Sequence, residues 1–287
     1  MQALKTIFVT GGTGNQGGAV ARNLINYGFK VKVLTRNPAS AAAQSLAKQG
    51  IQVNQGDLNE TDTFKQHIKD ADGVFSVQTF ENGIEKEIKQ GIDLARMAKE
   101  YNVRHFLYTS VAGADLHTGI PHWESKAEIE DCIKKLGISY TIIRPTSLYE
   151  NFLFPQVKNR LVKGKLVSPI DKNIVQQFIA SEDIGRISAK IFLKPDQYAS
   201  QTITLAAEQL DSIEVARILS ETLGKEIKYQ KLPAVITRLV MGKKLYKMFE
   251  WINENSGVFI KDMQEVKKEF PNLMSLKQWI QLHFKKS

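Results

Sequence analysis

A glycine-rich segment near the N-terminus is the clearest candidate for chemistry in this sequence. Residues 10–18 read TGGTGNQGG, and their glycines satisfy both G-x-G-x-x-G and G-x-x-G-x-x-G. Such glycines permit a tight turn, a close approach of the backbone to a pyrophosphate, and close packing of a helix on a strand. Free N–H groups at the start of the next helix then face the anion. The predicted phosphate-binding residues are Gly11, Gly12, Thr13, Gly14, Asn15, Gln16 and Gly17.

The segments around this loop alternate between strands and helices, as such a site requires. Apolar runs at 7–9, 30–34, 52–55, 73–77, 105–109 and 140–144 predict strands. Residues 17–27, 39–48, 61–68, 84–101 and 123–136 have helical spacing. Strands joined by helices form βαβ units with right-handed crossovers. We therefore expect an α/β fold in which residues 1–150 form a doubly wound parallel-sheet, NAD(P)-binding Rossmann domain.

The pattern changes after Pro145. Helical stretches at 151–162, 184–193, 211–223, 234–255 and 275–285 surround strand-like runs at 202–205 and 225–230, and 164–173 reads as a turn-rich connection. We expect residues 151–287 to form a smaller C-terminal α+β lobe that contacts a substrate or partner. Some of this chain is expected to return to the Rossmann sheet.

The end of the second predicted strand indicates which dinucleotide would bind. Proteins that use NAD usually place Asp or Glu here to accept a hydrogen bond from the ribose 2′-hydroxyl. This chain reads LTRNP at 34–38, without an acid, and Arg36 offers a cationic fork suited to a 2′-phosphate. The alternative is a solvated surface arginine. After the third strand, Asp57 and Leu58 could meet the adenine, or Asp57 could cap the next helix. We predict NADP(H) as the cofactor.

Further motifs extend over nearly the whole chain and resemble the NmrA-like family of atypical short-chain dehydrogenase/reductases, closest to its NADPH-sensing branch. They are the glycine loop, TRNP at 35–38, QGD at 55–57, EIKQG at 87–91, HWESK at 122–126, RP at 144–145, YENFL at 149–153, SEDIG at 181–185 and LKQWI at 276–280. As a set, these motifs are more specific than the glycine loop alone.

The resemblance implies additional cofactor contacts. It places Gln78, Thr79, Phe80 and Lys126 beside the nicotinamide ribose, Lys89 near the phosphates, and Leu148, Tyr149, Glu150 and Asn151 over the nicotinamide. These residues follow predicted strand ends or lie on the next helix, which is where ligands sit in open α/β sheets.

Catalytic residues are not identified by the sequence. Active short-chain dehydrogenases resemble one another in a Tyr-x-x-x-Lys helix and a serine after the fifth strand. Here Ser110 and Lys126 are present, but His122 takes the place of the tyrosine. A histidine can transfer a proton near neutral pH; alternatively, His122 caps the helix or lines the cleft. His122 and Ser110 are therefore candidates only.

Two functions remain open. The first is an NADP(H) redox sensor or regulator that responds to cofactor occupancy, as the resemblance implies. The second is an NADPH-dependent reductase of quinones or related carbonyl or ether substrates, with Phe152, Phe154 and Trp251 either in the second lobe's core or at a substrate. The predicted partners are NADP(H), either a protein or a small apolar substrate, and a second copy in a homodimer.

Composition excludes several other classes. The 287 residues carry a net charge of +9, densest at 225–247, but lack zinc-finger or RNP motifs, so nucleic acid is not expected. The histidine spacing and the single cysteine, Cys132, give no metal site, and there is no Gly-x-Ser-x-Gly elbow. Without a signal peptide or membrane-spanning run, we expect a soluble, cytoplasmic protein that does not bind membranes.

Overall fold

The structure is a computed structural model that describes residues 4–284, except the side chains of Lys243 and Lys244. It contains two compact units. The first runs up to Arg144 and includes Ser181–Ile203, and the second combines Pro145–Ala180 with the chain from Thr204 onward. None of the helices described is long and apolar enough to cross a membrane.

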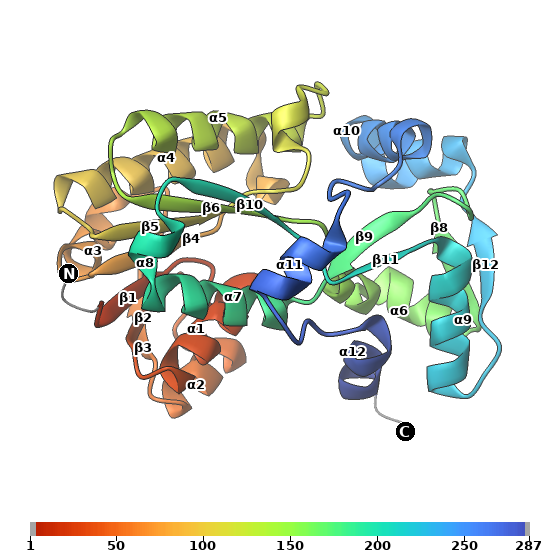
Figure 1. Cartoon of the computed structure of the whole chain (residues 1–287), viewed down its shortest axis with the longest axis horizontal. Coiled ribbons are helices and arrows are strands. Elements are labelled where there is room, and N and C mark those ends of the chain that lie inside the picture. The colour runs from red at the N-terminus through yellow and green to blue at the C-terminus, as the bar shows by residue number, and fades with distance from the viewer. Residues whose placement is uncertain (1–3, 285–287) are drawn as a thin grey trace. The chain divides into compact units, whose positions relative to one another are not determined.

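A seven-stranded sheet forms the centre of the first unit (Figure 1). Its strands are β1 (Thr6–Val9), β2 (Lys30–Thr35), β3 (Gln52–Gln55), β4 (Gly73–Ser76), β5 (His105–Thr109), β6 (Tyr140–Pro145) and β10 (Gln201–Leu205). Their order is β10-β6-β5-β4-β1-β2-β3. Each neighbouring pair among the first six strands, β1 to β6, is parallel. After β3 the chain crosses back to place β4 beside β1, which is the switch point of a doubly wound sheet. The predicted fold class is confirmed.

Helices cover both faces of this sheet (Figure 1). One face carries α1 (Asn15–Asn26), α2 (Ala41–Lys48) and α7 (Ser181–Leu193), and the other carries α3 (Lys65–Lys69), α4 (Ile84–Glu100) and α5 (Pro121–Lys135). Short turns of helix connect them: η1 (Thr61–Thr63), η2 (Phe80–Asn82), η3 (Ala114–Leu116) and α8 (Pro195–Tyr198). The returning helix α7 packs closely on α1, because a Cβ on Gly185 would lie 2.6 Å from the Ala19 carbonyl oxygen.

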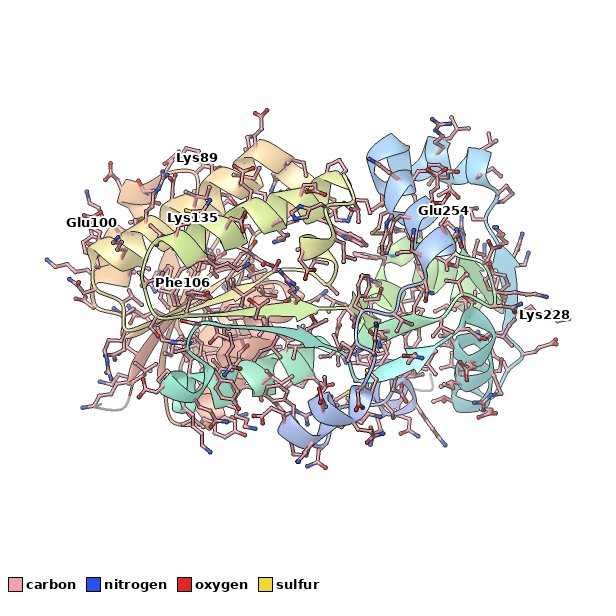
Figure 2. All side chains as sticks on the ribbon, turned by 45° about the horizontal axis from the view of Figure 1, so that its top comes forward. Lys89, Glu100, Phe106, Lys135, Lys228 and Glu254 are labelled. Carbon is pink, nitrogen blue, oxygen red and sulfur yellow. The ribbon has the colours of Figure 1, made fainter. Side chains whose placement is uncertain are left out.

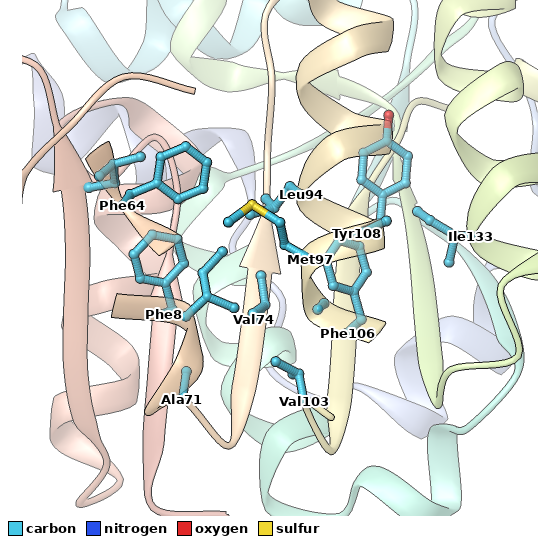
Figure 3. Packing of buried hydrophobic residues seen from close by; sticks show 14 of the residues in the cluster. Phe8, Phe64, Ala71, Val74, Leu94, Met97, Val103, Phe106, Tyr108 and Ile133 are labelled. Atoms are coloured by element: carbon cyan, nitrogen blue, oxygen red, sulfur yellow. The ribbon is translucent and has the colours of Figure 1, made fainter. Parts of the chain in front are cut away.

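A continuous apolar core fills the space between the sheet and α3–α5 (Figure 3). Strands β4 and β5 are buried along their whole length, as expected for parallel strands with helices on both faces. Phe8 stacks on Phe64 with ring centroids 6.2 Å apart, and Leu94 and Met97 of α4 pack against the same cluster. This core fixes the strand ends from which the candidate site is built.

The second unit contains two small sheets and several helices. Strands β7 (Ser147–Leu148), β9 (Gln176–Ile179) and β11 (Glu208–Leu210) form one sheet, and β8 (Lys165–Ser168) pairs with β12 (Lys228–Lys231) in the other. The helical segments are η4 (Tyr149–Leu153), α6 (Pro155–Val162), α9 (Ser212–Leu223), α10 (Ala234–Asn255), α11 (Met263–Glu269) and α12 (Leu276–His283). Capping boxes at Asp211 and Ser275 start α9 and α12, and the buried Trp279 anchors the core of this unit.

One prediction for the second unit was wrong. Residues 164–173 read as a turn-rich connection, but Lys165–Ser168 form β8, which pairs with β12 more than fifty residues later. Strand β9 was also missed because its first residues, Gln176 and Gln177, are polar. The Gln177 amide is buried yet satisfied: Nε2 donates to the Ile260 carbonyl (2.7 Å) and Oε1 accepts from the Ile260 N–H (3.0 Å).

His105 makes the stability of the fold depend on pH. It is fully buried in β5, where its ring nitrogens lie 3.0 Å from Ser139 Oγ and 2.9 Å from Thr141 Oγ1. Burial lowers its pKa from 6.5 to about 4, against the weaker opposing effect of Asp196. Between these values the unfolded chain binds the extra proton, so the free energy of unfolding decreases as the pH falls from about 6.5 to about 4.

We predict that His105→Gln reduces this pH dependence. One proton per molecule corresponds to about 1.4 kcal/mol per pH unit at most, and urea denaturation at pH 7 and pH 4.5 measures it. The exposed His117 provides the control, since His117→Gln should leave the slope unchanged. Equal slopes for wild type and His105→Gln would contradict the assignment.

Candidate functional site

The loop between β1 and α1 is shaped by contacts that leave no room for side chains. Gly11 has φ +60°, and its carbonyl accepts a hydrogen bond from the Gly14 N–H (2.9 Å). A Cβ on Gly17 would lie 2.4 Å from the Gly11 carbonyl oxygen, and one on Gly12 would lie 2.7 Å from Val33 Cβ. Backbone geometry therefore requires glycine at positions 11 and 17, and the Val33 side chain leaves no room for a Cβ at Gly12.

These contacts leave the start of α1 open. Gly14 is the N-cap residue, and in the described chain no side chain caps this helix. The first N–H groups of a helix have no partner within the helix, and the helix dipole places partial positive charge there. Thr13, Gly14 and Asn15 are exposed beside it. An uncapped helix start of this kind, at the carboxyl edge of a parallel sheet, has the features that bind anions.

Two threonines that the sequence analysis did not single out fix this loop to its neighbours. Thr10 Oγ1 accepts from the Val77 N–H (2.8 Å) and donates to the Val77 carbonyl (3.0 Å), which joins the ends of β1 and β4. Thr109 Oγ1 donates to Gln16 Oε1 (2.7 Å), which joins α1 to the end of β5. The only signal in the sequence is that each threonine ends, or directly follows, a predicted strand.

Arg36 directly follows β2 and points an exposed side chain into solvent. Its turn is ordered by local bonds: Thr35 Oγ1 accepts from the Asn37 N–H (3.2 Å), and Asn37 Oδ1 accepts from the Ala39 N–H (3.1 Å). Over residues 4–284 no carboxylate forms an ion pair with Arg36. The guanidinium therefore lies on a fixed backbone with its donors open to an anion.

Asp57 and Leu58 follow β3. Asp57 Oδ1 accepts from the backbone N–H of Asn59 (2.9 Å) and from its Nδ2 (2.8 Å), so this oxygen stabilises the local turn. Leu58 is half-buried against the core of the first unit. Asp57 does not cap the next helix, because the N-cap residue of η1 is Glu60; the Asp57 side chain forms a local turn before that helix instead.

Beyond β4 the chain forms a short polar and aromatic segment. Gln78 is buried, and its Nε2 donates to Ser76 Oγ (3.0 Å). Thr79 caps η2 by accepting from the Glu81 N–H (3.3 Å). Phe80 is 39% exposed and stacks on His122, with ring centroids 4.7 Å apart. The structure therefore brings Gln78, Phe80 and His122 together with Lys126.

Lys126 is buried, and its ammonium contacts one carbonyl and one carboxylate. Nζ lies 3.0 Å from the Gln78 carbonyl and 3.0 Å from Glu87 Oε1. Burial lowers the pKa of Lys126, and the Glu87 carboxylate opposes that shift. Glu87 was missed as a functional candidate, although it begins the EIKQG motif.

Lys89, taken from the same motif, lies on the exposed side of α4 (Figure 2). Two residues along an α-helix turn the side chain by roughly 200°, so Lys89 faces away from the buried side of α4 that Glu87 occupies. Its side chain is 62% exposed and pairs with Asp93, one helical turn later.

His122 is a neutral imidazole at neutral pH. It is 8% exposed at the start of α5, and burial, followed by the charge of Lys126, lowers its pKa to about 4. A histidine with this pKa has no imidazolium proton to give near pH 7. Proton donation by His122 in the manner of the tyrosine it replaces is therefore strongly disfavoured.

Ser110, the second catalytic candidate, lies beside a separate buried network. Arg144 binds both oxygens of Glu130, through Nε (2.8 Å) and Nη2 (2.6 Å), and also contacts Asp115 (2.6 Å). Although burial opposes ionisation, the hydrogen bond from Arg144 lowers the pKa of Glu130. The Ser110 hydroxyl beside this network is buried and meets no hydrogen-bond partner among the described residues.

The predicted nicotinamide loop lies in the second unit, where two of its side chains are bonded within that unit. Tyr149 is fully buried and its hydroxyl is 2.8 Å from Glu208 Oε2, while Glu150 Oε1 accepts from Trp279 Nε1 (3.1 Å). Leu148 forms part of β7, and Asn151 is exposed. Backbone groups and these last two side chains are what this loop could offer a ligand.

A family model described as NmrA-like matches residues 3–280. The chain belongs to the NmrA-like family. An NmrA-like family domain-containing protein of Dictyostelium discoideum is 29% identical over 269 residues, covering 88% of this chain and 89% of the relative. The family therefore accounts for both units, not the glycine loop alone.

Solved structures resemble this chain over almost all of its length. An NADPH-dependent quinone oxidoreductase of Escherichia coli, complexed with NADPH, gives a TM-score of 0.81 at 22% identity, with 97% of this chain and 100% of that chain covered. NmrA, a negative transcriptional regulator solved in complex with NADP, gives a TM-score of 0.78 at 20% identity, with 97% and 94% covered. At such identities the likeness establishes the fold.

The geometry of the loop predicts different costs for two glycine substitutions. Gly17→Ala should destabilise the chain by about 1–3 kcal/mol, because the new Cβ would overlap backbone that cannot move away. Gly14→Ala is the matched control, since its Cβ would lie 3.3 Å from the Gly11 carbonyl oxygen. Urea denaturation of both variants checks this, and equal losses would show that the approach at Gly17 is not the constraint.

Proposed function

We propose that this protein binds NADP(H) at the carboxyl edge of its seven-stranded sheet. The observation that carries the proposal is the uncapped start of α1, built on glycines that the backbone requires and placed at the switch point between β1 and β4. The N–H groups there suit the pyrophosphate. Support also comes from the quinone oxidoreductase and NmrA structures, which contain NADPH and NADP.

Arg36 supplies the preference for the phosphorylated cofactor. A 2′-phosphate next to β2 would meet an exposed guanidinium that has no competing carboxylate within the described chain. A neutral 2′-hydroxyl would gain much less, because the acceptor usual for NAD is missing at the end of β2. Leu58, together with a carboxylate oxygen of Asp57, would lie beside the adenine.

The remaining contacts stay predictions, and they differ in their support. Gln78, Thr79 and Phe80 follow β4, and Lys126 of α5 bonds the Gln78 carbonyl, which suits a place beside the nicotinamide ribose. Lys89 has less support, because it is exposed and paired with Asp93. For Leu148, Tyr149, Glu150 and Asn151, the proposed cover over the nicotinamide rests on the family resemblance.

We infer that the role is that of a redox sensor or regulator that responds to NADP(H) occupancy. The supporting observation is a cofactor cradle next to a position that holds neither the catalytic tyrosine nor an imidazolium. His122 replaces the catalytic tyrosine and is neutral, while the Lys126 ammonium is already held by Gln78 and Glu87. A protein partner and a homodimer belong to this proposal as its predicted consequences.

A second candidate, an NADPH-dependent reductase, is favoured by one specific feature. The Phe80 ring is 39% exposed and stacks on the buried His122. A planar acceptor such as a quinone could lie against the Phe80 ring, and positioning of the acceptor is the first requirement of hydride transfer. The resemblance to the quinone oxidoreductase fold is compatible with this candidate.

Calorimetric titration of the purified protein with NADPH, NADP⁺, NADH and NAD⁺ tests the main proposal. Preference for the two phosphorylated forms supports it, and a difference between NADPH and NADP⁺ supports a redox sensor. Binding of none of the four overturns it. NADPH oxidation with a panel of quinones separates the reductase from the sensor.

We predict that Arg36→Glu weakens NADPH binding far more than NADH binding. Replacing a charge-assisted contact of about 1.5–3 kcal/mol by repulsion corresponds to a loss of roughly 10- to 150-fold or more in affinity. Arg96→Glu on the exposed face of α4 changes the net charge equally and is the control. If both cofactors lose affinity by the same factor, Arg36 does not read the 2′-phosphate.

We also predict that His122→Phe leaves cofactor affinity, and any quinone turnover, within about threefold of wild type. The phenyl ring keeps the stack on Phe80, and the imidazole it replaces carries no imidazolium proton near pH 7. Isothermal titration and NADPH oxidation measure the two quantities. Loss of turnover with unchanged affinity would restore His122 as a catalytic candidate.

A further inference from the structure

A carboxylate lies fully buried on the inner side of α4. Glu87 has no exposed surface, whereas its neighbours Glu85, Lys86 and Lys89 on the same helix are exposed. Removing a carboxylate from water is strongly unfavourable unless a partner compensates its charge. The burial of Glu87 therefore needs an explanation, whereas the exposed charged residues of α4 need none.

The partners of Glu87 both come from α5. Its Oε1 lies 3.0 Å from Lys126 Nζ, and its Oε2 accepts a short hydrogen bond from Ser125 Oγ. An ammonium group has three N–H donors. On Lys126, the Gln78 carbonyl accepts one of them, and Glu87 Oε1 contacts the ammonium as an ion pair without hydrogen-bond geometry. Among residues 4–284 at least one donor is therefore left for a ligand.

Holding α4 against α5 does not require this ion pair. A Cβ on Gly91 would lie 2.7 Å from Ile129 Cδ1, so the two helices already pack at van der Waals contact one turn away. Buried ion pairs can often be replaced by apolar residues without loss of stability. The arrangement is better explained by what it does to the ammonium of Lys126.

We propose that Glu87 is the positioning residue of the cofactor site, whose carboxylate holds the Lys126 ammonium charged and directed, with one N–H left for the ribose oxygens of NADP(H). This inference rests on the proposed function, because the ribose contact of Lys126 is part of that proposal. Glu87 itself touches Lys126 and Ser125 and acts through the lysine.

The electrostatic surroundings single out Glu87 as the countercharge. On α5, His122 is neutral at working pH, because its pKa is about 4. On β5, the Tyr108 ring lies 5.5 Å from Lys126 Nζ, and burial raises its phenol pKa well above 10, so it carries no charge. Glu130 acts on Tyr108 and is bound by Arg144. Without Glu87, burial alone would act on the lysine and lower its pKa further.

The first experiment measures the lysine directly, without cofactor. NMR titration of lysine side-chain nitrogens gives the pKa of Lys126 in wild type and in Glu87→Gln. We expect this pKa to fall by about one pH unit or more in Glu87→Gln. The exposed Glu85→Gln is the matched control and should leave it unchanged. An unchanged Lys126 pKa in Glu87→Gln overturns the proposal, whatever the cofactor does.

The second experiment is a double-mutant cycle on NADPH affinity, read by calorimetry. Glu87→Gln and Lys126→Met should each weaken binding about tenfold, and the double variant should bind no more weakly than Lys126→Met. Additive losses would mean that Glu87 acts through the structure at large, which overturns the proposal. If Lys126→Met binds NADPH like wild type, the cofactor placement in the proposed function is what fails.

A conservative variant provides the remaining control. Glu87→Asp keeps the charge on a shorter side chain, so the Lys126 pKa should stay closer to wild type than in Glu87→Gln while NADPH affinity falls. This variant also applies if Glu87→Gln does not fold. A Lys126 pKa in Glu87→Asp as low as that of Glu87→Gln would show that the carboxylate charge is not what matters.

Discussion

The approach of Gly17 to the carbonyls of Gly11 and Thr10 is the constraint on which the first unit depends. It brings the start of α1 against the end of β1 and leaves the first N–H groups of the helix facing outward. The same helix is fixed from its other side by α7, where Gly185 allows an equally close contact and Asn23 bonds Glu182 (2.6 Å). The direction of α1, and therefore of its dipole, is set by these two close backbone approaches together with the Asn23–Glu182 hydrogen bond.

Periodicity predicted the first unit well because its elements are long and their burial is simple. Strands covered on both faces read as apolar runs, and α4 shows a clear helical repeat. The second unit was harder because its strands are short and pair over long distances. Gln177 looks like a surface residue in the sequence, and only the tertiary fold brings Ile260 to its amide. The kink of α10 at Gly242 likewise has no periodic signal.

In the candidate site, too, some features could be predicted from the sequence and others depend on the tertiary fold. Glycine spacing identified the loop because the loop depends on close backbone approaches. Only glycine permits these, so the residue type alone is a signal in the sequence. The role of Glu87 depends on which side of α4 faces α5, and a motif that contains both Glu87 and Lys89 does not state this. Tyr149 and Glu150 show the converse: a family motif marked them, but their side chains are bonded within the second unit.

Two buried ion pairs in the first unit differ in what they leave available. The Arg144 guanidinium meets both oxygens of Glu130 and one of Asp115, so its planar fork is used on several sides and the group holds β6 against α5. Lys126 meets one carboxylate and one carbonyl, and an ammonium directs three donors. Because His122 beside it is neutral, the charge at this position near pH 7 is that of the lysine and its single countercharge. A site of this kind is suited to hold an oxygen-rich ligand in place, and it has little capacity to supply protons to a reaction.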